Sequence, residues 1–147
     1  MNTQELAQAF AKALNASNWD AVASFLAPDF QFSGPVPEPV GAAEWISVNK
    51  ILQAGMPDMC INLRIVGVNG DEVQAVDQLT GTHTADLDLT SLGIGLIPAT
   101  GRRVTLPEER GVATVKNGKI TSIRLNTPAD GGMAGALAQL GVQPPQR

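Results

Sequence analysis

The spacing of apolar residues changes from a helical repeat to a strand repeat along the chain. In the first third, apolar residues recur every three or four positions, which predicts helices over 3–15, from Trp19 onward and over 42–54. From residue 59 apolar and polar residues alternate, and we expect four strands, over 59–68, 72–84, 103–115 and 119–126. A weakly helical pattern follows in 129–142.

Two short turns support antiparallel pairing of these strands. Asn69-Gly70-Asp71 and Asn117-Gly118 are sequences that form tight hairpin turns. Helices followed by a meander of strands predict an α+β fold, in which the helices cover one face of a curved, mostly antiparallel sheet. At 147 residues we expect one domain, 1–147. The other face of the sheet is mixed in polarity, so it would face solvent or a second subunit.

Composition excludes several functions. The net charge is −4 and the basic residues are scattered, so we expect no nucleic-acid partner. No run approaches the ~20 apolar residues of a membrane span, and the N-terminus does not resemble a signal peptide. These features favour a cytoplasmic protein. Cys60 and His83 are each the only residue of their type, so we expect no disulfide, no cysteine-based zinc site and no multi-histidine metal site within one chain.

The segment from Gly81 to Pro107 predicts a hydrophobic pocket with a lid. It begins as an alternating strand, passes through a loop rich in Leu and Ile, turns at Pro98-Ala99-Thr100-Gly101 and leaves as a second strand. The apolar loop residues, among them Leu87 and Leu92, are too many to leave in water. They would either close the pocket or be buried in a partner subunit.

Asp77 is the leading candidate for chemistry. With a period of two, it shares a strand face with Val73, Ala75 and Leu79. A carboxyl group on an apolar face is desolvated, which raises its pKa and suits a general acid or base. The alternative is that Asp77 lies at the sheet surface or caps a turn.

Four other residues are weaker candidates. His83 shares the nominal face of Asp77, but six residues of strand separate them by roughly 20 Å, so they would not form a dyad. Either His83 belongs to the pocket or it bonds to backbone at the strand end. Glu109 shares a strand face with Val115, Ala113 and Gly111 at a period of two, which predicts that it points toward the pocket. The alternative is that Glu109 lies at the surface. Trp19 and Trp45 lie on apolar helical stripes and form either core or pocket wall.

Several short motifs occur in an order that matches a known family. They are Asn18-Trp19-Asp20-Ala21, Pro28-Asp29-Phe30, Gly81-Thr82-His83-Thr84, the run from Ile97 to Val104, Asn117-Gly118-Lys119-Ile120 and the run from Leu137 to Val142. Together they resemble the nuclear-transport-factor-2-like superfamily and, within it, the SnoaL-like polyketide cyclases. This resemblance implies a cone-shaped domain with a deep apolar pocket, a homodimer formed through the outer sheet face, and aldol cyclisation without metal or cofactor. It also places His83 in the pocket.

One departure from the family leaves the function open. The resemblance places the family's catalytic Asp at Leu125, within Ile123-Arg124-Leu125, where Ile123 and Leu125 would contact substrate. The first hypothesis is a cofactor-independent acid/base enzyme, such as a SnoaL-like cyclase, acting on a bulky apolar carbonyl compound with Asp77 and His83 as functional residues. The second is a non-catalytic binding protein for a hydrophobic metabolite, which Leu125 favours. The third is a dimeric module whose lid docks another protein.

Overall fold

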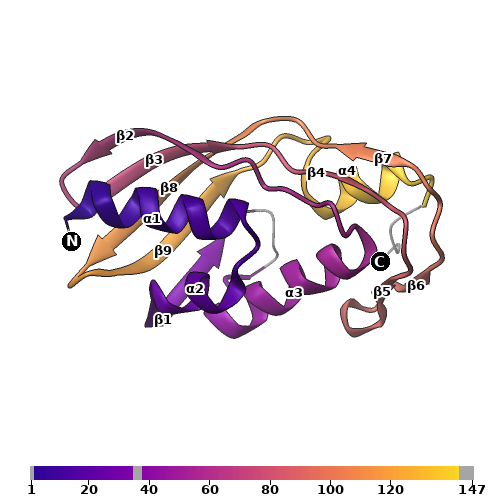
Figure 1. Cartoon of the computed structure of the whole chain (residues 1–147), viewed down its shortest axis with the longest axis horizontal. Coiled ribbons are helices and arrows are strands. Elements are labelled where there is room, and N and C mark those ends of the chain that lie inside the picture. Colours follow the sequence, from indigo (N-terminus) through magenta and orange to yellow (C-terminus); the bar gives the residue numbers. More distant parts are fainter. Residues whose placement is uncertain (1, 35–37, 143–147) are drawn as a thin grey trace.

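The computed structural model describes residues 2–34 and 38–142, and these form helices packed on a curved sheet (Figure 1). The helices are α1 (Thr3–Asn15), α2 (Trp19–Ser24), α3 (Ala42–Gly55), the short 3-10 helix η1 (Thr90–Leu92) and α4 (Gly132–Gln139). The strands are β1 (Leu26–Ser33), β2 (Arg64–Asn69), β3 (Glu72–Asp77), β4 (Thr80–Thr82), β5 (Leu87–Leu89), β6 (Gly95–Ile97), β7 (Arg103–Thr105), β8 (Glu109–Lys116) and β9 (Lys119–Asn126).

The main sheet has the strand order β1-β9-β8-β3-β2. β1 runs parallel to β9, and the other neighbours are antiparallel. This mixed but largely antiparallel sheet with helices on one face confirms the predicted α+β class. The predicted glycine turns join β2 to β3 and β8 to β9, where Gly70 and Gly118 adopt positive φ values of 62° and 73°.

The first helix follows its sequence pattern closely. Asn2 Oδ1 accepts a hydrogen bond from the Glu5 amide at 2.8 Å, and the Glu5 side chain accepts one from the Asn2 amide at 3.4 Å. This capping box satisfies amide groups that the first helical turn leaves without a partner. The apolar stripe of α1, which includes Leu6 and Phe10, is buried against the sheet and the neighbouring helices.

Three predicted strands are shorter than expected because the sheet bends. The segment predicted over 59–68 is regular only from Arg64, after Asn62 with φ 54°. The segment over 72–84 breaks after Asp77, and that over 103–115 breaks after Thr105. At the bend, Asn62 Nδ2 donates to the Gln78 carbonyl at 2.8 Å, and Gln78 Nε2 donates to the Leu106 carbonyl at 3.1 Å. Side chains thus satisfy backbone groups that a straight ladder would have paired.

Beyond the bend, β4 and β7 form a small separate sheet, and the lid folds as a hairpin of β5 and β6. In Figure 1 these strands and α4 lie at the end of the molecule opposite the N-terminus. Leu87, Leu89 and Ile97 of the lid are buried, whereas Leu92 and Leu96 are exposed at 38% and 55%. The lid therefore contributes one apolar face to the core and leaves the other open.

Candidate functional site

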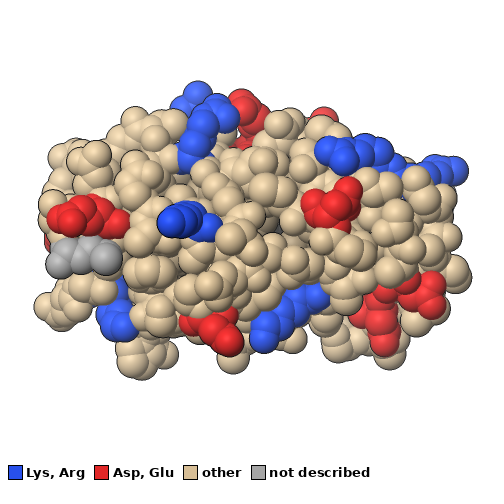
Figure 2. Space-filling model, in the orientation of Figure 1, with Lys and Arg blue, Asp and Glu red and all other residues tan. Residues whose placement is uncertain are grey.

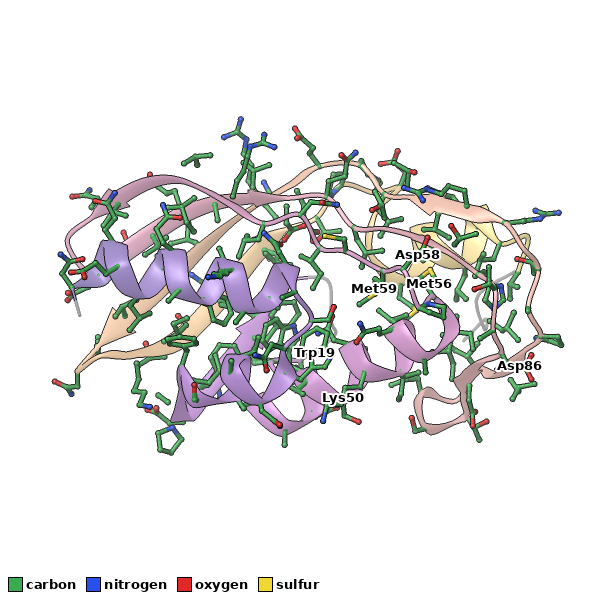
Figure 3. All side chains as sticks on the ribbon, in the orientation of Figure 1. Trp19, Lys50, Met56, Asp58, Met59 and Asp86 are labelled. Carbon is green, nitrogen blue, oxygen red and sulfur yellow. The ribbon has the colours of Figure 1, made fainter. Side chains whose placement is uncertain are left out.

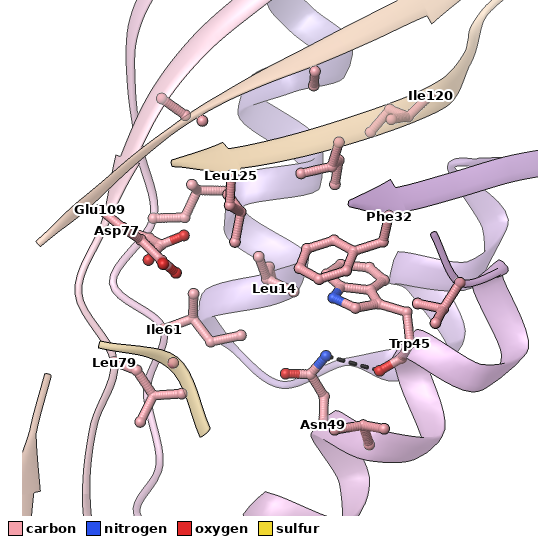
Figure 4. A pocket seen from close by; sticks show the side chains of 18 of the residues that line it. Leu14, Phe32, Trp45, Asn49, Ile61, Asp77, Leu79, Glu109, Ile120 and Leu125 are labelled. Atoms are coloured by element: carbon pink, nitrogen blue, oxygen red, sulfur yellow. Dashed lines mark hydrogen bonds between the residues drawn. The ribbon is translucent and has the colours of Figure 1, made fainter. Parts of the chain in front are cut away.

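A cavity of about 740 Å³ lies between the helices and the concave face of the sheet. Its walls are mostly apolar, and α1, α3, β3, β8, β9 and the lid all contribute residues to it. Figure 4 shows the sheet residues Asp77, Glu109 and Leu125 on one wall and the helix residues Trp45 and Asn49 on another. A cavity of this size fits a small organic molecule.

Two acidic side chains meet in this cavity. The antiparallel register pairs Asp77 of β3 directly with Glu109 of β8, and both residues line the cavity. Residues paired across antiparallel strands bring their side chains together on one face of the sheet. Glu108, the neighbour of Glu109, points outward and forms an ion pair with Arg64 at 3.1 Å. The alternation expected from the sequence therefore places Glu109, and not Glu108, inside.

The environment of Asp77 favours its protonated form. Asp77 is only 8% exposed. Burial raises the pKa of Asp77 to about 8, and a hydrogen bond with the Glu109 side chain and the negative charge of Glu109 add to this effect. Thr127 Oγ1 donates a hydrogen bond to Glu109 Oε2 at 2.7 Å. One carboxyl group of the pair thus retains its proton near neutral pH, while the other is held by a hydroxyl donor.

The ionisable side chains among the described residues that line the cavity are all acidic. None of the described residues that line it is Lys, Arg or His. The exposed Glu38 and Glu44 also belong to the lining. Negative charge without a counter-charge disfavours an anionic ligand, because its charge would be buried without a partner.

Most of the predicted pocket residues line the cavity. They are Trp45, Asp77, Leu79, Leu92, Glu109, Ile123 and Leu125. Trp45 is held by aromatic neighbours, and its ring stacks on that of Phe32 with 5.4 Å between centroids. Leu125, where the family resemblance predicts an acid, carries no ionisable group, and the acid pair of the cavity comes from β3 and β8.

Three predicted residues lie elsewhere. Trp19, labelled in Figure 3, does not line the cavity. It bridges α2 and α3, because its Nε1 donates a hydrogen bond to Gln53 Oε1 at 2.7 Å. Leu87 packs in the core beside Gly55 and is also absent from the cavity lining.

His83 is the third of these residues. It is fully buried, and its Nδ1 lies 2.9 Å from Thr100 Oγ1. The same Nδ1 accepts a hydrogen bond from the backbone amide of Thr100 at 3.2 Å. The Arg102 carbonyl oxygen accepts a hydrogen bond from the backbone amide of His83 at 2.9 Å. This environment matches the alternative of a histidine bonded at the strand end, where it ties β4 to the start of β7.

Asn49 is a cavity residue that the sequence reasoning missed. It lies one helical turn after Trp45 on α3 and is 8% exposed. The four-residue spacing from Trp45 places both on the same helix face and could have identified it.

The described residues contain no group of three or more His, Cys, Asp or Glu residues placed to hold a metal ion. Among the helices in the described ranges, none combines the length and apolar character needed to cross a membrane. Basic residues are spread over the face shown in Figure 2 as separate groups, interspersed with acidic ones.

Comparison with known proteins places the chain in a family. Residues 7–123 match the model of the SnoaL-like domain, and the chain belongs to this family. A search of curated proteins found no match.

Solved structures of the same fold come from several bacteria. AclR from Streptomyces galilaeus, described as a candidate hydroxylase, superposes with a TM-score of 0.71 at 19% identity, covering 99% of this chain and 84% of AclR. IdmH from Streptomyces antibioticus, described as a candidate polyketide cyclase, gives 0.69 at 22% identity and covers 97% of this chain and 100% of IdmH. An LEH-like epoxide hydrolase of M. tuberculosis gives 0.62 at 20% identity, with coverages of 95% and 87%. At these identities the likeness supports the shared fold alone.

Proposed function

We propose that this protein is a cofactor-independent acid/base enzyme that acts on a bulky, apolar, uncharged carbonyl compound, by SnoaL-like cyclisation or a related proton transfer. The observation that carries the proposal is the Asp77–Glu109 pair within an apolar cavity. Neighbouring carboxyl groups that hold one proton between them provide an acid and a base at the same pH.

The two carboxyl groups take different roles in the proposed reaction. Asp77, protonated near neutral pH, donates its proton to the substrate carbonyl oxygen. Glu109, held by the Thr127 hydroxyl, accepts a proton from the carbon next to that carbonyl. The product of this step is an enol, whose carbon can then attack a second carbonyl of the same molecule. As the new carbon–carbon bond forms, Asp77 takes back the enol proton and the first carbonyl is restored. Glu109 gives its proton to the oxygen of the attacked carbonyl, which becomes a hydroxyl group, so the pair ends in its starting state.

The proposal assigns no catalytic role to His83 or Leu125. His83 does not line the cavity, and Leu125 carries no ionisable group. The acid function that the family places at the position of Leu125 is assigned here to the pair on β3 and β8.

Deuterium exchange into a model ketone tests the acid/base function without knowledge of the natural substrate. Acetylnaphthalene is incubated with the protein in heavy water, and exchange of its methyl protons is followed by NMR. Because general acid–base groups contribute roughly 10²–10⁴-fold, Asp77→Asn and Glu109→Gln should each reduce exchange by at least about 100-fold. Glu108→Gln is the matched control, since it changes the adjacent outward carboxylate, and it should exchange at the wild-type rate. Exchange no faster than in buffer, or unchanged by Asp77→Asn, would refute the proposal.

A non-catalytic binding protein is the second candidate, and it is favoured by Leu125 at the position of the family's acid. In that case acetylnaphthalene binds to the wild-type protein, but its methyl protons exchange only at the rate in buffer.

A further inference from the structure

A buried polar group faces the cavity from the helix wall. Asn49 on α3 lines the cavity and is more than nine-tenths buried. Its Nδ2 donates a hydrogen bond to the Trp45 carbonyl oxygen at 2.9 Å (Figure 4). Burial of a polar side chain among apolar residues is costly unless its polar atoms find hydrogen-bond partners. The orientation and partner of the other polar atom of this amide, Oδ1, therefore indicate what the cavity can bind.

The hydrogen bond determines which way the amide faces. Because a carbonyl oxygen can only accept, the atom that contacts Trp45 must be the amide nitrogen of Asn49. Oδ1 therefore points away from the helix backbone, and Figure 4 shows it directed toward the cavity. Within the described residues it accepts no hydrogen bond. Asn49 Oδ1 is thus an oriented acceptor that a bound molecule can reach.

The surroundings of Asn49 define a second pole of the cavity. The acid pair lies on the sheet wall and Asn49 on the helix wall, and Figure 4 shows apolar side chains such as Ile61 and Leu14 around the space between them. A ligand that fills this space meets a proton donor at Asp77 and a pure acceptor at Asn49. The two walls of the cavity therefore favour different functional groups.

We propose that the ligand carries an uncharged hydroxyl group, separated from its reacting carbonyl by an apolar body, and that Asn49 Oδ1 accepts the hydroxyl proton. Asn49 is then a specificity-determining residue. The inference rests on the proposed function for the carbonyl end only. It concerns equilibrium binding, so it is tested separately from proton exchange.

Matched ligand pairs isolate the hydroxyl contact. Acetophenone, acetylnaphthalene and acetylbiphenyl are each compared with the counterpart that carries a hydroxyl at the far end of the ring system. The three sizes sample the distance between the two poles. The dissociation constants are measured by calorimetry or fluorescence for the wild type, Asn49→Leu and Asn49→Ala, with folding checked by near-ultraviolet circular dichroism. Two Asn49 variants are included because either one alone could disturb the helix.

In the wild type, the hydroxyl should tighten binding roughly three- to ten-fold for at least one size, which is the effect of one buried hydrogen bond. Both Asn49 variants should reduce this ratio to about one and change the binding of the hydroxyl-free ligand by less than about two-fold. Val48→Leu alters the shape of the neighbouring cavity wall without changing a polar group, and it should keep the wild-type ratio.

Three results would overturn the inference. They are a ratio near one for every size in the wild type, a ratio that survives in a folded Asn49 variant, and failure of all three hydroxylated ligands to bind. Loss of exchange activity with an intact hydroxyl ratio would instead reject the acid/base function and leave the role of Asn49 standing.

Discussion

Replacing Asp77 with Asn should make the protein more stable at neutral and alkaline pH. Asn has nearly the same shape as Asp but carries no charge, so the substitution removes the cost of ionising a buried carboxyl group. Because Asp77 is 8% exposed and faces Glu109, this cost is large in the folded protein and absent in the unfolded chain.

The magnitude follows from the pKa of Asp77. This group ionises near 3.8 in its ordinary environment and at about 8 in the folded protein. Between these values the folded protein retains a proton that the unfolded chain has lost, so the stability present below pH 3.8 declines as the pH rises toward 8. The full effect is about 6 kcal/mol, at 1.36 kcal/mol for each pKa unit. About 4 kcal/mol of it should develop between about pH 5 and about pH 8.

Urea denaturation of the wild type and Asp77→Asn across this pH range measures the effect. The difference between their free energies of unfolding should grow with pH in favour of the variant, while titrating groups remote from the pair cancel. Glu109→Gln should make the free energy of unfolding depend less strongly on pH, because it removes the negative charge next to Asp77. A difference that stays constant from about pH 5 to about pH 9 would refute the view that Asp77 is a buried carboxyl group protonated at neutral pH.

Two further predictions concern the support of the site. Thr127→Val should slow exchange while leaving the melting temperature nearly unchanged, because Glu109 loses the 2.7 Å hydroxyl donor that orients its carboxyl group. An exchange rate equal to that of the wild type would exclude a positioning role for Thr127. Trp45→Ala should lower the free energy of unfolding, measured by urea denaturation, by about 3 kcal/mol. The reason is that Trp45 loses its aromatic contacts with Phe10, Phe30 and Phe32. A loss below about 1 kcal/mol would contradict that packing role.

The spacing of apolar residues was sufficient to predict the bounds of a helix or strand wherever those bounds depend on that element alone. α1 covers 3–15 and β9 covers 119–126, as the apolar repeats predicted. The predicted strands failed where the chain bends, at Asn62 and after Asp77, because side-chain hydrogen bonds there replace the regular ladder. Alternation alone does not reveal such bonds, since they join residues far apart in the sequence.

For the site, the sequence by itself determined which faces carry the acids. Period-two alternation turned Asp77 toward the apolar side of its strand, and the same counting turned Glu109 inward. Only the tertiary structure decided that the two carboxyl groups meet, because β3 and β8 are joined by a long connection that contains the lid, and sequence spacing does not determine the register across it. The pKa of Asp77 is therefore a tertiary property. It arises from burial and a neighbouring charge, and both depend on how distant segments of the chain pack together.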